Sequence, residues 1–178
     1  MNTKSAAGGT AFTLSSVRFK DVLNIESLQI DACKVSGKME RVLFICVHNS
    51  ARSQMAEAYL RRYGEKRFVV ESAGLEPGTI NPLVVEVMKE EGIDLSGRQT
   101  NSVHDFYEQG RRYDYVITVC SKDAAERCPI FPGGGRRLHW PFDDPSKAAG
   151  TRDQKLSQVR RIRDQIRQQV LSFMQSAG

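Results

Sequence analysis

The sequence lacks the long apolar runs that membrane-spanning proteins and secreted precursors carry. No stretch of the 178 residues approaches the roughly 20 consecutive apolar residues that span a bilayer. The opening segment 1–14, MNTKSAAGGTAFTL, has no continuous hydrophobic region followed by a cleavage site, as a signal peptide would. We therefore expect a soluble, cytoplasmic protein with no membrane partner.

Cysteine and histidine are scarce, with four and three residues respectively. The cysteines are Cys33, Cys46, Cys120 and Cys128, and neither a pair of C-x-x-C knuckles nor histidines at ligand spacing accompany them. This pattern is a poor match to a zinc site. Permanent disulfides are rare in cytoplasmic chains, so these cysteines indicate packing or redox chemistry. We expect no metal bound to them and no tightly bound cofactor.

Aromatic residues do not accompany the positive charge of the chain. The net charge is +5 and the isoelectric point is about 9.1, with the excess concentrated in RRIRDQIR (160–167) and GGGRR (133–137). Neither segment contains a nucleic-acid-binding motif. We interpret the basic residues as a solvated helix face that also attracts small oxyanions, and we expect no nucleic-acid partner.

Residues 1–38 lack the hydrophobic periodicity of the rest of the chain. They are rich in Ser, Gly, Thr and Lys, with scattered apolar residues. We expect a poorly ordered N-terminal extension here and one folded domain at 39–178. Met39 stands directly before the first strand signal and is an alternative start of the protein. We assign no catalytic role to Cys33.

Strand and helix signals alternate from residue 41 onward. Apolar, β-branched runs predict strands at 41–47, 67–74, 113–120 and 136–142, and three- and four-residue spacings predict helices at 53–64, 82–91 and 156–173. This alternation predicts an α/β fold with a parallel sheet covered on both faces. Ligands bind beyond the carboxyl ends of such strands, so we expect Cys46 and Cys120 on the same rim.

The segment CVHNSARS, Cys46 to Ser53, joins the first strand to the first helix. A turn of small and polar residues before a helix directs several backbone N–H groups into one concavity, which suits a tetrahedral oxyanion. The same dipoles stabilise a thiolate at Cys46 and lower its pKa, which makes this cysteine a nucleophile. The predicted substrate-binding residues are Val47, His48, Asn49, Ser50, Ala51, Arg52 and Ser53.

Three side chains of this loop have specific expected tasks. The guanidinium of Arg52 can donate two parallel hydrogen bonds to an oxyanion. Ser53 places a hydroxyl near the sulfur and is a candidate cap of the helix. Asn49 is expected to hold the turn in a left-handed conformation, which asparagine tolerates.

Several stretches in addition to this loop carry a family resemblance. CVHNSARSQMAEAYL, VESAGLEPGTINPLVVEVMKEEGIDLSG, VITVC, CPIFPGG and HWPFDDPS occur in the order typical of one family, from about Arg41 to the final helix. Together they resemble the thioredoxin-linked arsenate reductases built on the low-molecular-weight tyrosine phosphatase fold. The resemblance implies a three-layer α/β/α domain with a four-stranded parallel sheet, and reduction of arsenate to arsenite for arsenic detoxification.

The resemblance also implies roles for the remaining cysteines. Cys46 attacks arsenate, Cys120 resolves the adduct, and Cys128 then attacks Cys120 to give a disulfide that thioredoxin reduces. This relay requires a marginal helix within 121–127, a segment one residue longer than is usual in the family. The alternative is that Cys120 only packs at a strand end and that Cys128 has no role.

An acid and an ion follow from the resemblance as well. Asp144, before Pro145, is expected to protonate the leaving oxygen, and the neighbouring Asp143 is an alternative whose charge would raise the pKa of Asp144. Asp144 in an exposed turn is the simpler interpretation. Glu57 and Ser72 match positions at which some relatives bind a structural potassium ion.

Two other functions use the same loop. The first is a low-molecular-weight tyrosine phosphatase. Such enzymes usually carry Pro where this chain has Gln54, and they surround the Asp-Pro pair with aromatic residues. They also need neither Cys120 nor Cys128. A non-enzymatic oxyanion sensor is the second, and it would not need those cysteines and Asp144 together. We expect a monomer that binds arsenate and uses thioredoxin, with glutaredoxin or a small thiol as alternative reductants.

Overall fold

The structure is a computed structural model that describes residues 38–64 and 66–177. Apart from Lys38, the extension predicted at residues 1–38 lies outside these ranges, as does Cys33.

Four parallel strands form the sheet in the order β2-β1-β3-β4. The strands are β1 (Glu40–Cys46), β2 (Phe68–Gly74), β3 (Tyr115–Thr118) and β4 (Arg136–His139). The central strand β1 pairs with both β2 and β3, and its residues 42–46 are buried. An unbroken apolar run suits a strand that is covered on both faces, which confirms the predicted parallel sheet.

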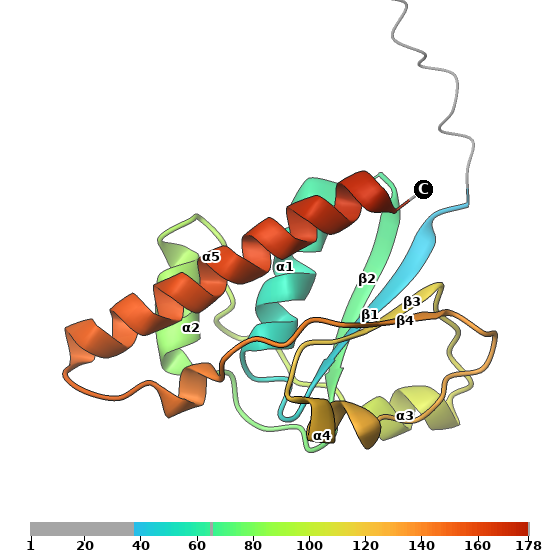
Figure 1. Ribbon diagram of the computed structural model, residues 1–178, viewed down its shortest axis with the longest axis horizontal. Helices are drawn as coiled ribbons and strands as arrows, with labels where there is room; N and C mark the ends of the chain where they lie inside the picture. The colour runs from blue at the N-terminus through green and yellow to red at the C-terminus, as the bar shows by residue number, and fades with distance from the viewer. Residues whose placement is uncertain (1–37, 65, 178) are drawn as a thin grey trace, which may run out of the picture. The chain divides into compact units, whose positions relative to one another are not determined.

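Helices lie on both sides of this sheet (Figure 1). They are α1 (Arg52–Gly64), α2 (Pro82–Lys89), α3 (Val103–Glu108), α4 (Lys122–Glu126), a short 3-10 helix η1 (Pro145–Lys147) and α5 (Arg152–Ser176). The long helix α5 packs against α1 and α2 on one side, while α3 and α4 lie on the other (Figure 1). The apolar positions predicted for its inner face are all buried: Leu156, Val159, Ile162, Ile166, Val170 and Phe173. The three-layer α/β/α architecture is therefore confirmed.

Capping residues mark where two of the helices begin. Asn81 caps α2 through its side chain, which accepts from the Leu83 N–H, and Pro82 is the first helical residue. The six-residue helix α3 was not predicted, because it is too short to show a helical period; its side-chain cap is Ser102. None of the helices in the described part of the chain is long and apolar enough to cross a membrane.

The carboxyl ends of β1 and β3 bring two cysteines to the same rim. Cys46 is the last residue of β1, and β3 ends at Thr118 instead of at Cys120 as predicted. The Val119 N–H still donates to the carbonyl of Ile45, which keeps the chain beside β1 as far as Cys120. Both cysteines are buried there, at 2% and 0% exposure.

Candidate active site

The loop between β1 and α1 is a backbone cradle. The carbonyls of Val47, His48 and Ser50 accept hydrogen bonds from N–H groups of the segment 76–81, on the outer side of the loop. The C=O and N–H of one trans peptide point in opposite directions, so the N–H groups that follow these carbonyls point to the inner side. The N–H of Asn49 is one of them and donates to Cys46 Sγ at 3.1 Å. Such inward N–H groups can bind an oxyanion.

Asn49 has the left-handed conformation that the sequence predicted. Its φ is 51°, the only positive value at a non-glycine position among the described residues. The conformation turns the Asn49 N–H toward the Cys46 sulfur, which accepts its hydrogen bond.

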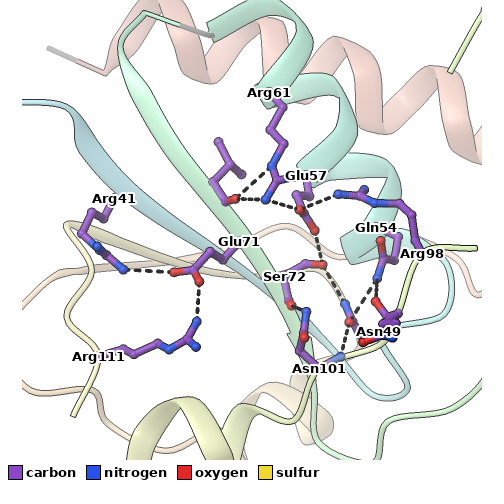
Figure 2. Close-up of polar contacts among 12 residues, drawn as sticks. Arg41, Asn49, Gln54, Glu57, Arg61, Glu71, Ser72, Arg98, Asn101 and Arg111 are labelled. Atoms are coloured by element: carbon purple, nitrogen blue, oxygen red, sulfur yellow. Dashed lines mark hydrogen bonds and ion pairs between the residues drawn. The ribbon is translucent and has the colours of Figure 1, made fainter. Parts of the chain in front are cut away.

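The side chain of Asn49 is fully buried and uses its whole hydrogen-bonding capacity (Figure 2). Its Nδ2 donates to Ser72 Oγ at 2.8 Å and to Ser53 Oγ at 2.9 Å. Its Oδ1 accepts from Gln54 Nε2 and from the Asn101 N–H, at 3.1 and 2.8 Å. The last two partners were not predicted: Gln54 lies in the first turn of α1, and Asn101 lies in a loop distant in sequence.

Ser53 contacts the sulfur but does not cap the helix. Its Oγ lies 3.0 Å from Cys46 Sγ, as expected. The expectation that it caps α1 was wrong, since the helix begins at Arg52 and Ser53 lies within its first turn. The hydroxyl is directed to the reactive atom.

Arg52 connects the cradle to the loop after β4. Its Nη2 donates to Asp144 Oδ2 at 2.8 Å and its Nη1 to the carbonyl of Phe142 at 3.1 Å. Its buried Nε has no hydrogen-bond partner among the described residues. A bound oxyanion would satisfy this donor. The arginine side chain is only 8% exposed, so its charge acts where water screens it little.

Asp144, and not its neighbour, pairs with Arg52. Burial opposes the ionisation of Asp144, but hydrogen bonds from the N–H and hydroxyl of Ser146, with the charges of Arg52 and Lys147, outweigh it and lower the pKa of Asp144. The expectation that Asp143 would raise this pKa was wrong. Asp143 is exposed to solvent, whereas Asp144 is held by cations and donors.

Cys120 and Cys128 are both free and buried. Burial raises the pKa of Cys120, and the charge of Cys46 raises it further. Burial, followed by the charge of Cys120, raises the pKa of Cys128 from 9.0 to about 12.

The helix between these two cysteines is marginal, as predicted. α4 has five residues, and the side chain of its N-cap residue Ser121 makes no capping hydrogen bond. Such a helix is near the lower limit of stability and opens at low cost.

Gly74, at the end of β2, was missed by sequence reasoning. A Cβ added to it would lie 2.7 Å from the nitrogen of Asn49 and 2.8 Å from the backbone of both His48 and Val47. The strand therefore presses directly on the cradle, and only glycine allows this approach.

No group of three or more His, Cys, Asp and Glu side chains gathers at one point within 38–64 and 66–177. The polar side chains around Asn49 form hydrogen bonds with one another. The groups that the site offers for chemistry are hydrogen-bond donors and thiols.

Comparison with known proteins identifies the family. The family model of the low molecular weight phosphotyrosine protein phosphatases matches residues 41–177. The chain belongs to this family. The match begins one residue inside β1, covers the other three strands and runs to the last described residue, so it includes the loop from Cys46 to Arg52.

Its similar relatives within this family include arsenate reductases. The arsenate reductase of Bacillus subtilis is 41% identical over 135 residues, which cover 76% of this chain and 95% of the relative. A thioredoxin-dependent arsenate reductase of Corynebacterium glutamicum is 33% identical with a TM-score of 0.57, over 80% of this chain and 66% of that one. The tyrosine phosphatase Wzb of Escherichia coli K30 has a TM-score of 0.63 at 18% identity, over 79% and 100%, and shares the fold.

Replacing Gly74 with alanine should distort the cradle, because three backbone groups would have to move. We expect a loss of about 1–3 kcal/mol in the free energy of unfolding and a loss of the thermal stabilisation given by phosphate. The control is Gly78→Ala, whose Cβ would meet His48 Cβ at an ordinary 3.6 Å. Denaturant titration and thermal unfolding with and without phosphate measure both effects. Equal behaviour of the two variants would contradict the tight approach.

Alkylation of Cys128 should be slow in the folded, reduced protein. A pKa raised from 9.0 to about 12 lowers the thiolate fraction by about a thousandfold, so we expect iodoacetamide to react with Cys128 at least about a hundredfold more slowly than in urea. Ala125→Gly weakens α4 by about 1 kcal/mol and should speed the reaction, while Gln169→Gly in α5 should not. Peptide mass spectrometry gives the rates. Equal rates in folded and unfolded protein would refute the burial of this thiol.

Proposed function

We propose that this protein is an arsenate reductase that acts in arsenic detoxification through a relay of three thiols. The observation that carries the proposal is the placement of three free, buried thiols: Cys46 ends β1 in the cradle, Cys120 follows the segment that stays bonded to β1, and Cys128 follows the five-residue helix α4. Phosphoryl transfer would need only the first of these thiols. The curated relatives, which are named arsenate reductases at about 40% identity, support the same chemistry.

The first step forms a bond between arsenic and sulfur. The Cys46 thiolate, which accepts hydrogen bonds from the Asn49 N–H and the Ser53 hydroxyl, attacks arsenate held by the loop 47–53 and by Arg52. Water leaves, and a thiol ester of arsenate remains on Cys46.

The next two steps move electrons and then a disulfide. Cys120 attacks the Cys46 sulfur, the sulfur–arsenic bond breaks, and its electron pair leaves with arsenic as arsenite. Cys128 then attacks Cys120 and releases the Cys46 thiolate. Because a disulfide needs Cα atoms about 5.5 Å apart and Cys128 is buried, α4 unwinds to allow this attack. Opening also returns the Cys128 thiol to water, where more of it ionises.

Asp144 is the proposed acid of the first step. Its pKa is lowered by Ser146 and Arg52, so it would be ionised before arsenate binds. A bound oxyanion takes hydrogen bonds from Arg52 and adds negative charge nearby, and both changes raise the pKa of Asp144. The proton is thus taken up with the substrate and given to the leaving oxygen.

We assign the reductant to thioredoxin, because unwinding of α4 would expose a Cys120–Cys128 disulfide to a protein partner, and because one structural relative is described as thioredoxin-dependent. The thiols must begin the cycle reduced, which fits the cytoplasm. A monomer suffices, since one chain supplies every group named above. Tyrosine phosphatase activity is the second candidate, favoured by the cradle itself.

The relay is tested with arsenate, thioredoxin, thioredoxin reductase and NADPH under anaerobic conditions. Wild type should oxidise NADPH continuously and Cys46→Ser not at all. Cys128→Ser should release one arsenite and stop with Cys46 joined to Cys120. Repeated turnover by Cys128→Ser would contradict the relay, and hydrolysis of an aryl phosphate without arsenate reduction would favour the phosphatase.

The pH profile of the first step tests the acid. An acid must be protonated to act, so the rate should fall as pH rises through the pKa of Asp144 in the complex. Ser146→Ala removes a hydrogen bond that lowers this pKa, so the fall should move to higher pH. Asp144→Asn should lower the rate by about 10²–10⁴, and Asp143→Asn should not. Single-turnover arsenite release measures these rates; an unchanged Asp144→Asn would exclude the assignment.

A further inference from the structure

A buried carboxylate lies behind the cradle. Glu57, on α1, has a side chain only 5% exposed. Its Oε2 accepts a hydrogen bond from the Ser72 hydroxyl, and its Oε1 accepts one from Arg98 Nη2 at 2.7 Å and forms an ion pair with Arg61 Nη2 at 2.8 Å (Figure 2). A charge buried to this degree is stable only when it is paired and hydrogen-bonded.

Glu57 fixes the direction of a chain of hydrogen bonds that ends on the reactive sulfur. Ser72 gives its one hydroxyl proton to Glu57, so its oxygen accepts from Asn49. Asn49 gives its other amide proton to Ser53. The hydroxyl proton of Ser53 is therefore left for Cys46. A group that orients Glu57 thus also orients the donor to the thiolate.

The two arginines at Glu57 are not equivalent. Arg61 is 54% exposed and also donates through Nε and Nη2 to the carbonyl of Val70. Arg98 is 24% exposed and contributes its charge from the loop between α2 and α3. That loop also supplies the Asn101 N–H to Asn49, so Arg98 anchors it against the cradle at a second point.

Glu57 and Ser72 are the residues at which the sequence suggested a potassium ion. In this structure Arg98 Nη2 binds the Oε1 atom of Glu57, which a potassium ion would need as a ligand. The Ser72 hydroxyl is also occupied, because it donates to Glu57 and accepts from Asn49. We propose that the guanidinium of Arg98 takes the place of a potassium ion at Glu57. Its positive charge holds the Glu57 carboxylate and so positions the hydrogen-bond donors to Cys46. The protein therefore needs no monovalent ion at this site. The effect on arsenate reduction rests on the proposed function; the effect on Cys46 does not.

The test replaces Arg98 with alanine and follows iodoacetamide alkylation of Cys46 at neutral pH by peptide mass spectrometry. In sodium chloride the variant should react at least about fivefold more slowly than wild type. When the sodium chloride is replaced by potassium chloride at the same ionic strength of about 0.1 M, most of the lost rate should return. Wild type should react equally in both salts, and thermal unfolding should show potassium stabilising only the variant.

Two further variants keep the proposal falsifiable. Arg98→Lys retains a cation and should resemble wild type in sodium, and adding Glu57→Gln to Arg98→Ala should abolish the potassium response. Arg152→Ala, which removes an exposed pair with Glu86, is the matched control. A potassium response of wild type, or an Arg98→Ala protein that is unaffected or not rescued, would overturn the proposal. These readouts need no arsenate, so a failure of arsenate reduction alone would refute only the proposed function.

Discussion

The active site depends on the hydrogen bonds of one buried amide, the side chain of Asn49. A positive φ is costly for most residues and persists only where the surroundings determine it. Here two donated and two accepted hydrogen bonds join the loop to α1, β2 and the segment before α3. The same residue therefore sets the backbone shape that forms the cradle and the orientation of Ser53 toward Cys46.

The three cysteines are all buried, but their surroundings differ. Cys46 lies at the end of the central strand with two donors aimed at its sulfur. Burial raises the pKa of Cys120 and of Cys128, so both stay protonated in the closed protein. A short helix with a weak cap connects them. This arrangement supports the proposed order of reaction, in which Cys120 and Cys128 act only after the first step or after α4 opens.

The parts of the site that are local in sequence could be predicted, and the parts that depend on distant contacts could not. The strand–loop–helix pattern and the left-handed Asn49 follow from residue types within a few positions. The cap assigned to Ser53 failed because α1 begins one residue earlier, at Arg52, and the Ser53 hydroxyl contacts Cys46 and Asn49 instead. Partners such as Asn101 for Asn49, and Arg52 for Asp144, come from segments far apart in the chain that carry no local signal.

Single-turnover release of arsenite from Asn49→Asp tests the account most directly. Aspartate has the same shape and tolerates the same backbone conformation, but it cannot donate to Ser72 and Ser53. The account predicts release slowed by about 100-fold, while Asn81→Asp, which still caps α2, stays at the wild-type rate. Release by Asn49→Asp at the wild-type rate would contradict the claim that this amide organises the site.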